Sequence, residues 1–215
     1  TDIISLSAVG SFRAELAPGH FVIVDQFIDR TFAREKSFFG PGLVAHVSVA
    51  HPTNSRLADW CEAACRSEGI TVHRGGTYLA MEGPQFSTLA ESNLYRQWGC
   101  DVIGMTNMPE AKLAREAEIP YCTVAMVTDY DCWHPDHDNV EVDALIRVLM
   151  DNADKARTLV KQVAPRMKER PAVCPSGDDR ALEVALITAP EKRDPEFLKK
   201  FDAIAGRLLK PQEQK

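Results

Sequence analysis

A nearly continuous apolar run at residues 121–127 (YCTVAMV) constrains the fold more than any other feature of this sequence. A strand that faces solvent on one side alternates apolar and polar residues, so an unbroken run of this length indicates a strand buried on both faces. Such strands belong to mainly parallel sheets that helices cover. The sequence therefore predicts an α/β fold with a mixed, mainly parallel, twisted sheet flanked by helices.

The remaining sequence follows a strand-and-helix order on either side of this run. Helix patterns are expected at residues 55–68, 87–98, 109–119, 142–163 and 195–209. Further strands are expected at residues 3–9, 20–28 and 70–73, near Tyr78, and at residues 101–105. Ser55 is the expected N-cap of the first helix. No linker or repeat divides the chain, so we expect one domain over residues 1–209 and a polar tail at 210–215.

Composition argues against several classes of protein. The net charge is -6 and Lys and Arg form no stripe, which argues against a nucleic-acid partner because phosphate contacts need clustered cations. No apolar stretch approaches the roughly 20 residues that span a bilayer, so no membrane partner is expected. The six cysteines include no CxxC pair, which favours free thiols in a reducing cytoplasm over disulfides or a structural zinc site.

Polar or small residues follow four of the expected strands. They lie at residues 7–11 (SAVGS), 81–87 (MEGPQFS), 105–107 (MTN) and 128–131 (TDYD). In parallel sheets, ligands bind beyond the carboxyl ends of the strands. We therefore expect these four segments to collect at one rim and form a pocket, with backbone N–H groups of residues 7–11 available to an anion.

Each segment also has a simpler interpretation. Residues 7–11 could form an ordinary turn, because small residues are common in turns. Thr106 and Asn107 could only cap the helix that follows them, and Phe86 could be a core ring. Glu82 is harder to explain in this way, since a carboxylate between Met81 and Gly83 needs a partner if it is buried.

The stretch after the apolar run, VTDYDCWHPDHD at residues 127–138, is rich in acids. If it stays extended, Asp129 and Asp131 face the same side, roughly 7 Å apart, with Tyr130 opposite. Two carboxylates so close in a partly dry pocket favour a raised pKa for one of them, which could then protonate a leaving group. A metal site would need residues 134–138 to converge, but Pro135 bends the chain, so we expect a polar lid there and no metal.

Five short segments, taken together, resemble the nucleoside phosphorylase family. They are residues 7–11 (SAVGS), 25–31 (DQFIDRT), 82–87 (EGPQFS), 105–106 (MT) and 128–133 (TDYDCW). The similarity runs from residue 1 to about residue 163, with a looser match beyond. It implies phosphorolysis of methylthioadenosine to adenine and 5-methylthioribose 1-phosphate, with inorganic phosphate as co-substrate, no cofactor and a homotrimeric assembly.

The resemblance also implies roles for individual residues. Asp129 and Asp131 are the implied catalytic acids at the N7 and N6 edge of adenine. The implied phosphate-binding residues are Ser7, Ala8 and Thr106. The implied substrate-binding residues are His46, Phe86, Ser87, Met105, Asp129, Tyr130, Asp131 and Val142. Within that set, His46 would reach a neighbouring subunit's site near the alkylthio group, and Ser87 and Val142, being small or apolar, suit that group better than a 5′-hydroxyl.

Acids at both purine positions agree with a 6-amino base. A carboxylate accepts hydrogen bonds from an amino group but would face the oxygen lone pairs of a 6-oxopurine, for which Asn would be expected. Three alternatives remain open. They are a phosphorylase for unmodified nucleosides, a nucleosidase that uses water, and a non-catalytic nucleoside-binding relative.

The sequence departs from the family at its beginning. The family's N-terminal section, with its first strand, a glycine-rich phosphate loop and an Arg-His pair, has no counterpart here. We expect a fragment of a longer protein, because a domain without core strands would expose much apolar surface. If the 215 residues were the whole protein, purine binding without efficient phosphorolysis would be expected.

Overall fold

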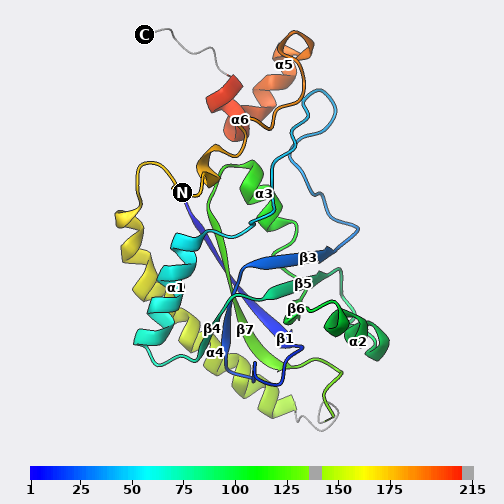
Figure 1. Ribbon diagram of the computed structural model, residues 1–215, viewed down its shortest axis with the longest axis vertical. Coiled ribbons are helices and arrows are strands. Elements are labelled where there is room, and N and C mark those ends of the chain that lie inside the picture. The colour runs from blue at the N-terminus through cyan, green and yellow to red at the C-terminus, as the bar shows by residue number, and fades with distance from the viewer. Residues whose placement is uncertain (136–141, 210–215) are drawn as a thin grey trace.

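The computed structural model describes residues 1–135 and 142–209, and its centre is one mixed, curled sheet flanked by helices (Figure 1). The strands are β1 (Ile3–Ser11), β2 (Phe21–Val24), β3 (Gln26–Arg30), β4 (Val72–Arg74), β5 (Thr77–Met81), β6 (Val102–Gly104) and β7 (Tyr121–Tyr130). Their order in the seven-stranded sheet is β3-β5-β6-β1-β7-β2-β4. Four neighbouring pairs are parallel and two are antiparallel, so the predicted mixed, mainly parallel sheet is confirmed.

The apolar run at residues 121–127 forms most of β7, beside β1 in the middle of the sheet. All of residues 121–127 except Met126 are buried. Ala125 and Val127 pack into a core on one face, while Cys122 and Val124 pack into a core on the other. The prediction of a strand buried on both faces is therefore confirmed.

The single strand expected at residues 20–28 is wrong, because the chain turns a corner at Asp25. The backbone N–H groups of Asp25 and Gln26 both donate to the carbonyl of Gly76, and an Asp25 carboxylate oxygen accepts from the Gly76 N–H. Gly76 has φ +143°, a conformation that other residues rarely adopt. At this corner the chain passes from β2, which lies next to β4 at one end of the strand order, to β3, which lies next to β5 at the other end. The sheet is therefore curled.

The helices are α1 (Ser55–Ser67), α2 (Leu89–Gln97), α3 (Glu110–Glu116), α4 (Val142–Val163), α5 (Pro195–Leu198) and α6 (Asp202–Leu209). The expected N-cap Ser55 is wrong by one residue, since the Asn54 carbonyl oxygen of the side chain accepts from the Leu57 N–H at 3.1 Å. The helix expected at residues 195–209 is interrupted by a 3-10 turn at Lys199–Phe201. Among the described helices, none is long and apolar enough to span a membrane.

Helices cover the two faces of the sheet unequally. α1 and α4 pack together on one face, where Leu57 and Leu159 are fully buried. α3 covers the other face through Ala111 and Ala114. The C-terminal segment packs separately against the loop before α1, with Leu43 and Leu182 at the centre of that contact (Figure 1).

Candidate active site

Asp129 and Asp131 converge over one glycine of the neighbouring strand. A Cβ atom placed on Gly10 would lie 3.7 Å from Asp129 Oδ2 and 3.5 Å from the Asp131 Cβ. Both side chains therefore leave β7 on the same side, as expected. The register of β1 and β7 shifts between Val9 and Gly10, and this irregularity brings Gly10 opposite Asp129.

Hydroxyl groups orient the two carboxylates. The Thr128 hydroxyl donates to Asp129 Oδ1 at 2.6 Å, and the Ser87 hydroxyl donates to Asp131 Oδ2 at 3.1 Å. Asp131 is only 7% exposed, so these contacts are made in a largely dry environment. Ser87, expected near the alkylthio group, thus contacts Asp131, which was expected at the purine.

Tyr130 points away from the two acids. Its hydroxyl donates to the Ala14 carbonyl at 2.9 Å, and its ring stacks on His134 with centroids 4.3 Å apart. Trp133 is fixed as well, because its indole N–H donates to the Ser11 carbonyl at 2.8 Å. His134, expected in a polar lid, thus packs on the Tyr130 ring, while residues 136–138 lie outside the described part of the chain.

The expected phosphate-binding hydroxyls lie together in the middle of β1. Residues 7–11 belong to this strand, so both expectations for them, a turn and a loop after the strand, are wrong. β6 runs antiparallel to β1, so the chain leaving β6 returns along β1. This path brings Thr106 Oγ1 to 2.7 Å from the buried Ser7 Oγ, while Ala8 is exposed beside them.

Thr106 and Asn107 do not cap the next helix, so that simpler interpretation is wrong. The N-cap of α3 is Pro109, and no side chain caps it. Asn107 instead faces β1, where its side-chain oxygen accepts from the Ser5 hydroxyl at 2.9 Å. The segment after β6 is thus fixed along β1 by side-chain contacts.

Two further expected substrate-binding residues follow neighbouring strands, Phe86 after β5 and Met105 directly after β6. A Cβ atom on Gly83 would lie 2.6 Å from Met105 Sδ, so glycine at this position lets the segment after β5 lie against Met105. Phe86 is 84% exposed, which excludes the alternative of a core ring. By strand geometry, three residues of β1 separate the Ser7 group from Gly10 by roughly 10 Å.

Of the remaining expected site residues, His46 lies at another pocket and Val142 is described only by its backbone. The His46 N–H donates to the Ala185 carbonyl at 2.9 Å, and His46 lines a separate pocket of about 730 Å³ together with Arg74 and Arg115. Val142 begins α4, but its side chain lies outside the described residues.

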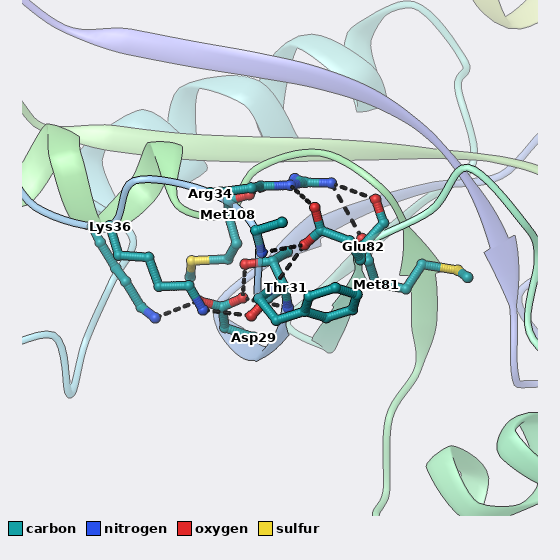
Figure 2. Close-up of polar contacts among 10 residues, drawn as sticks. Asp29, Thr31, Arg34, Lys36, Met81, Glu82 and Met108 are labelled. Atoms are coloured by element: carbon teal, nitrogen blue, oxygen red, sulfur yellow. Dashed lines mark hydrogen bonds and ion pairs between the residues drawn. The ribbon is translucent and has the colours of Figure 1, made fainter.

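Two further carboxylates, Asp29 and Glu82, have structural partners (Figure 2). Glu82 accepts from the Phe32 N–H at 2.7 Å and pairs with Arg34, whose guanidinium also donates to the Glu82 carbonyl at 2.8 Å. The Glu82 carboxylate thus has the partner that the sequence required, and it anchors the loop after β3.

Asp29 lies beside this loop and accepts from both a hydroxyl and two ammonium groups. Thr31 Oγ1 donates to it at 2.6 Å, Lys36 Nζ lies 3.2 Å away, and Lys112 also donates. Burial opposes ionisation of Asp29, but the hydrogen bonds from Lys112, Thr31 and Lys36 outweigh it and hold its pKa well below the usual range. The negative charge of this carboxylate is therefore balanced by the neighbouring lysines.

The sequence placed Gly10 and Thr128 in segments expected to form the pocket but assigned neither of them a role, and it did not indicate Tyr78 as part of the site. Tyr78 lies in an apolar stretch of β5, and nothing in that pattern indicates that its hydroxyl lies 3.1 Å from Ser7 Oγ. In residues 1–135 and 142–209, no group of three or more His, Cys, Asp or Glu side chains could hold a metal ion.

Comparisons with known proteins identify the family of this chain. The model of the phosphorylase superfamily matches residues 1–165. The S-methyl-5′-thioadenosine phosphorylase of Rhodospirillum rubrum is 66% identical over 97% of this chain and 71% of its own length. That of Cereibacter sphaeroides is 67% identical over 98% of this chain and 72% of its own length.

Solved structures show the same fold. A methylthioadenosine phosphorylase from an antarctic soil metagenomic library superposes with a TM-score of 0.87 at 47% identity, covering 94% of this chain and 71% of that one. The methylthioadenosine phosphorylase from Schistosoma mansoni in complex with adenine has a TM-score of 0.80 at 28% identity, over 86% and 73% of the two chains. The chain therefore belongs to the phosphorylase superfamily, as a member of its S-methyl-5′-thioadenosine phosphorylase family.

Proposed function

We propose that this chain catalyses the phosphorolysis of S-methyl-5′-thioadenosine, which yields adenine and 5-methylthioribose 1-phosphate and serves purine and methionine salvage. The observation that carries the proposal is the convergence of Asp129 and Asp131 over Gly10. Farther back on the strand that carries Gly10 lies Ser7, whose hydroxyl is 2.7 Å from that of Thr106. A nucleoside with a phosphate beyond its ribose would reach from the two acids to these hydroxyls.

At the purine end, the acids assist departure of the base. When the glycosidic bond breaks, its electron pair moves onto the purine and the ribose becomes positively charged. A carboxylic acid at Asp129 or Asp131 donates its proton to N7 of the departing base, a general-acid contribution of about 10²–10⁴-fold. The neighbouring carboxylate accepts a hydrogen bond from the 6-amino group, which selects adenine over a 6-oxopurine.

At the other end, phosphate is the nucleophile. The Ser7 and Thr106 hydroxyls, with the backbone at Ala8, hold the anion, and a phosphate oxygen forms the new bond to C1′. Met105 lies along the ribose, and the exposed ring of Phe86 packs on the purine. Inorganic phosphate is a co-substrate in this reaction, and no cofactor takes part.

We further propose a homotrimer in the cytoplasm. His46 lies apart from the acids, and its pocket includes Val184, which is 93% exposed. This exposed apolar surface supports a contact through which His46 reaches a neighbouring copy near the alkylthio group. Six free cysteines suit a reducing compartment. Light scattering of the purified chain tests the trimer.

The test of the proposed reaction is adenine release from S-methyl-5′-thioadenosine with and without inorganic phosphate. We expect release only with phosphate, together with formation of the sugar 1-phosphate. Equal release without phosphate would establish a nucleosidase and contradict the proposal. Binding without turnover would indicate a non-catalytic relative, and faster turnover of adenosine than of the methylthio compound would indicate a different nucleoside phosphorylase.

A further inference from the structure

Tyr78 brings a third hydroxyl to the pair formed by Ser7 and Thr106. Its side chain is fully buried in β5 and packs against Phe27, with ring centroids 5.7 Å apart. Its phenol oxygen lies 3.1 Å from Ser7 Oγ and 3.1 Å from Thr106 Oγ1. Since Ser7 and Thr106 are themselves 2.7 Å apart, the three hydroxyls form a closed triangle of hydrogen-bond contacts.

The phenol reaches this place only because position 104 is glycine. A Cβ atom on Gly104 would lie 1.9 Å from the Tyr78 hydroxyl oxygen and 2.7 Å from the ring carbon that bears it. Neither contact is sterically allowed, so any larger residue at position 104 would displace the ring. Tyr78 on β5 and Gly104 on β6 thus form a matched pair that delivers one hydroxyl to the Ser7 group.

The Tyr78 hydroxyl supplies a hydrogen-bond donor that the other two hydroxyls need when they bind an anion. Each hydroxyl carries one proton and can accept through two lone pairs. Without an anion, three protons satisfy the three sides of the triangle. If Ser7 and Thr106 turn their protons toward an anion, the phenol supplies the remaining proton inside the triangle, and the Thr106 backbone N–H, 3.4 Å away, can donate to the phenol oxygen.

Without the phenol, the same two residues would satisfy each other. Ser7 and Thr106 are close enough for one hydroxyl to donate to the other. Only one of their two protons would then remain for an anion. A phosphate would then receive one hydrogen bond fewer, or would have to break the Ser7–Thr106 contact. The phenol prevents this, because it offers a donor to a hydroxyl whose own proton points outward.

We propose that Tyr78 is a positioning residue for phosphate, which acts through the Ser7 and Thr106 hydroxyls without touching the anion. This inference rests on the proposed function and on the roles proposed there for Ser7 and Thr106. Loss of the Tyr78 hydroxyl should therefore weaken the binding of phosphate and not that of the nucleoside, since the acids over Gly10 lie roughly 10 Å along the strand from the triangle.

Tyr78→Phe removes only the hydroxyl and tests the proposal in steady-state kinetics. A hydrogen bond to a charged group is lost or weakened, so the KM for phosphate should rise about 10-fold or more, while the KM for the nucleoside changes less than about 3-fold. Tyr95→Phe is the matched control, because Tyr95 is also buried but lies in the cluster under α2. We expect that control to leave both KM values unchanged.

A second variant and a double-mutant cycle guard against a merely structural effect. Tyr78→Met fills the space with a flexible chain that has no hydroxyl, and should raise the phosphate KM as Tyr78→Phe does. In a Thr106→Val background, Tyr78→Phe should cost less than it does in the wild type, since one of the hydroxyls it acts through is already gone.

The outcomes separate this inference from the proposed function. A phosphate KM within about 3-fold of wild type in Tyr78→Phe, or an equal rise of both KM values, would overturn the positioning role even if the wild type is an active phosphorylase. A wild-type protein that releases adenine without phosphate would overturn the proposed function instead.

Discussion

Two carboxylates of this chain lie at the carboxyl ends of strands but have different kinds of hydrogen-bond donor, charged in one case and neutral in the other. Asp29, at the end of β3, accepts hydrogen bonds from two lysines and from Thr31 (Figure 2). Asp131, just beyond β7, accepts from the Ser87 hydroxyl and the Cys132 thiol, both of which are neutral. Both side chains are largely buried, so burial alone does not distinguish them.

The difference lies in where the counter-charge comes from. Two lysines of the fold balance the charge of Asp29, so this ion pairing stabilises the loop after β3. The Asp29 carboxylate is therefore not available to bind a ligand. Neutral donors hold Asp131 in one orientation and bring no counter-charge, which suits the role that we propose for it at the purine. Their partners thus distinguish Asp29, which stabilises the fold, from Asp131, for which we propose a role at the purine.

The largest effect is expected from Asp131→Asn, which exchanges an acid for an amide of the same shape. The variant should lose about 10²–10⁴-fold in kcat/KM for S-methyl-5′-thioadenosine, because neither proton donation nor acceptance from the amino group survives intact. Its free energy of unfolding should change little, since Ser87 can donate to the amide oxygen. Steady-state kinetics and urea unfolding measure the two quantities, and a large loss of stability with activity intact would contradict the comparison.

Asp29→Asn should show the reverse pattern. Removing the charge leaves Lys36 and Lys112 without their partner, so the free energy of unfolding should fall by about 2 kcal/mol at pH 7. Turnover per folded molecule should stay within a few-fold of wild type.

The pH dependence of that variant sharpens the test. Because the pKa of Asp29 is lowered in the folded protein, its contribution to stability is present above the ordinary carboxyl pKa and is lost as the pH falls toward the folded-state pKa. The difference between wild type and Asp29→Asn should therefore be full at pH 7 and shrink below about pH 4. A difference that stays constant down to pH 3 would show that the lost interaction is not ionic.

The smallest effect concerns two adjacent hydroxyls with different partners. Ser87→Ala should lower kcat/KM by about 10-fold, because Asp131 loses the donor that orients it. Thr88→Ala is the matched control, since Thr88 caps α2 through the Glu91 N–H and should cost about 1 kcal/mol of stability without changing kcat/KM. Equal kinetic effects of the two substitutions would argue against a specific role for Ser87.

Local patterns predicted the elements but not the way the chain joins them. The amphipathic period gave both ends of α4, and the apolar run gave β7, because each pattern reports burial directly. The break at Asp25 was missed, since residues 20–28 are apolar on both sides of it and the corner depends on contacts with Gly76. Pairing across the sheet decides such a turn, and a single sequence does not display it.

The candidate site was predictable to a similar extent. The spacing of Asp129 and Asp131 indicated one shared face, and the structure has it. The contact of Ser87 with Asp131 joins residues 44 positions apart, and the Tyr78 triangle depends on a glycine in another strand. Neither leaves a periodic signal in the sequence, because both arise from the approach of segments distant along the chain.

The most direct test of the central claim, that the acids over Gly10 read a 6-amino purine, compares two substrates that differ only at that position. The measurement is kcat/KM for S-methyl-5′-thioadenosine and for its 6-oxo analogue, in the wild type and in Asp131→Asn. The wild type should prefer the 6-amino substrate by about 100-fold or more, and the variant should reduce that ratio at least about 10-fold. The same ratio in both proteins would contradict the account.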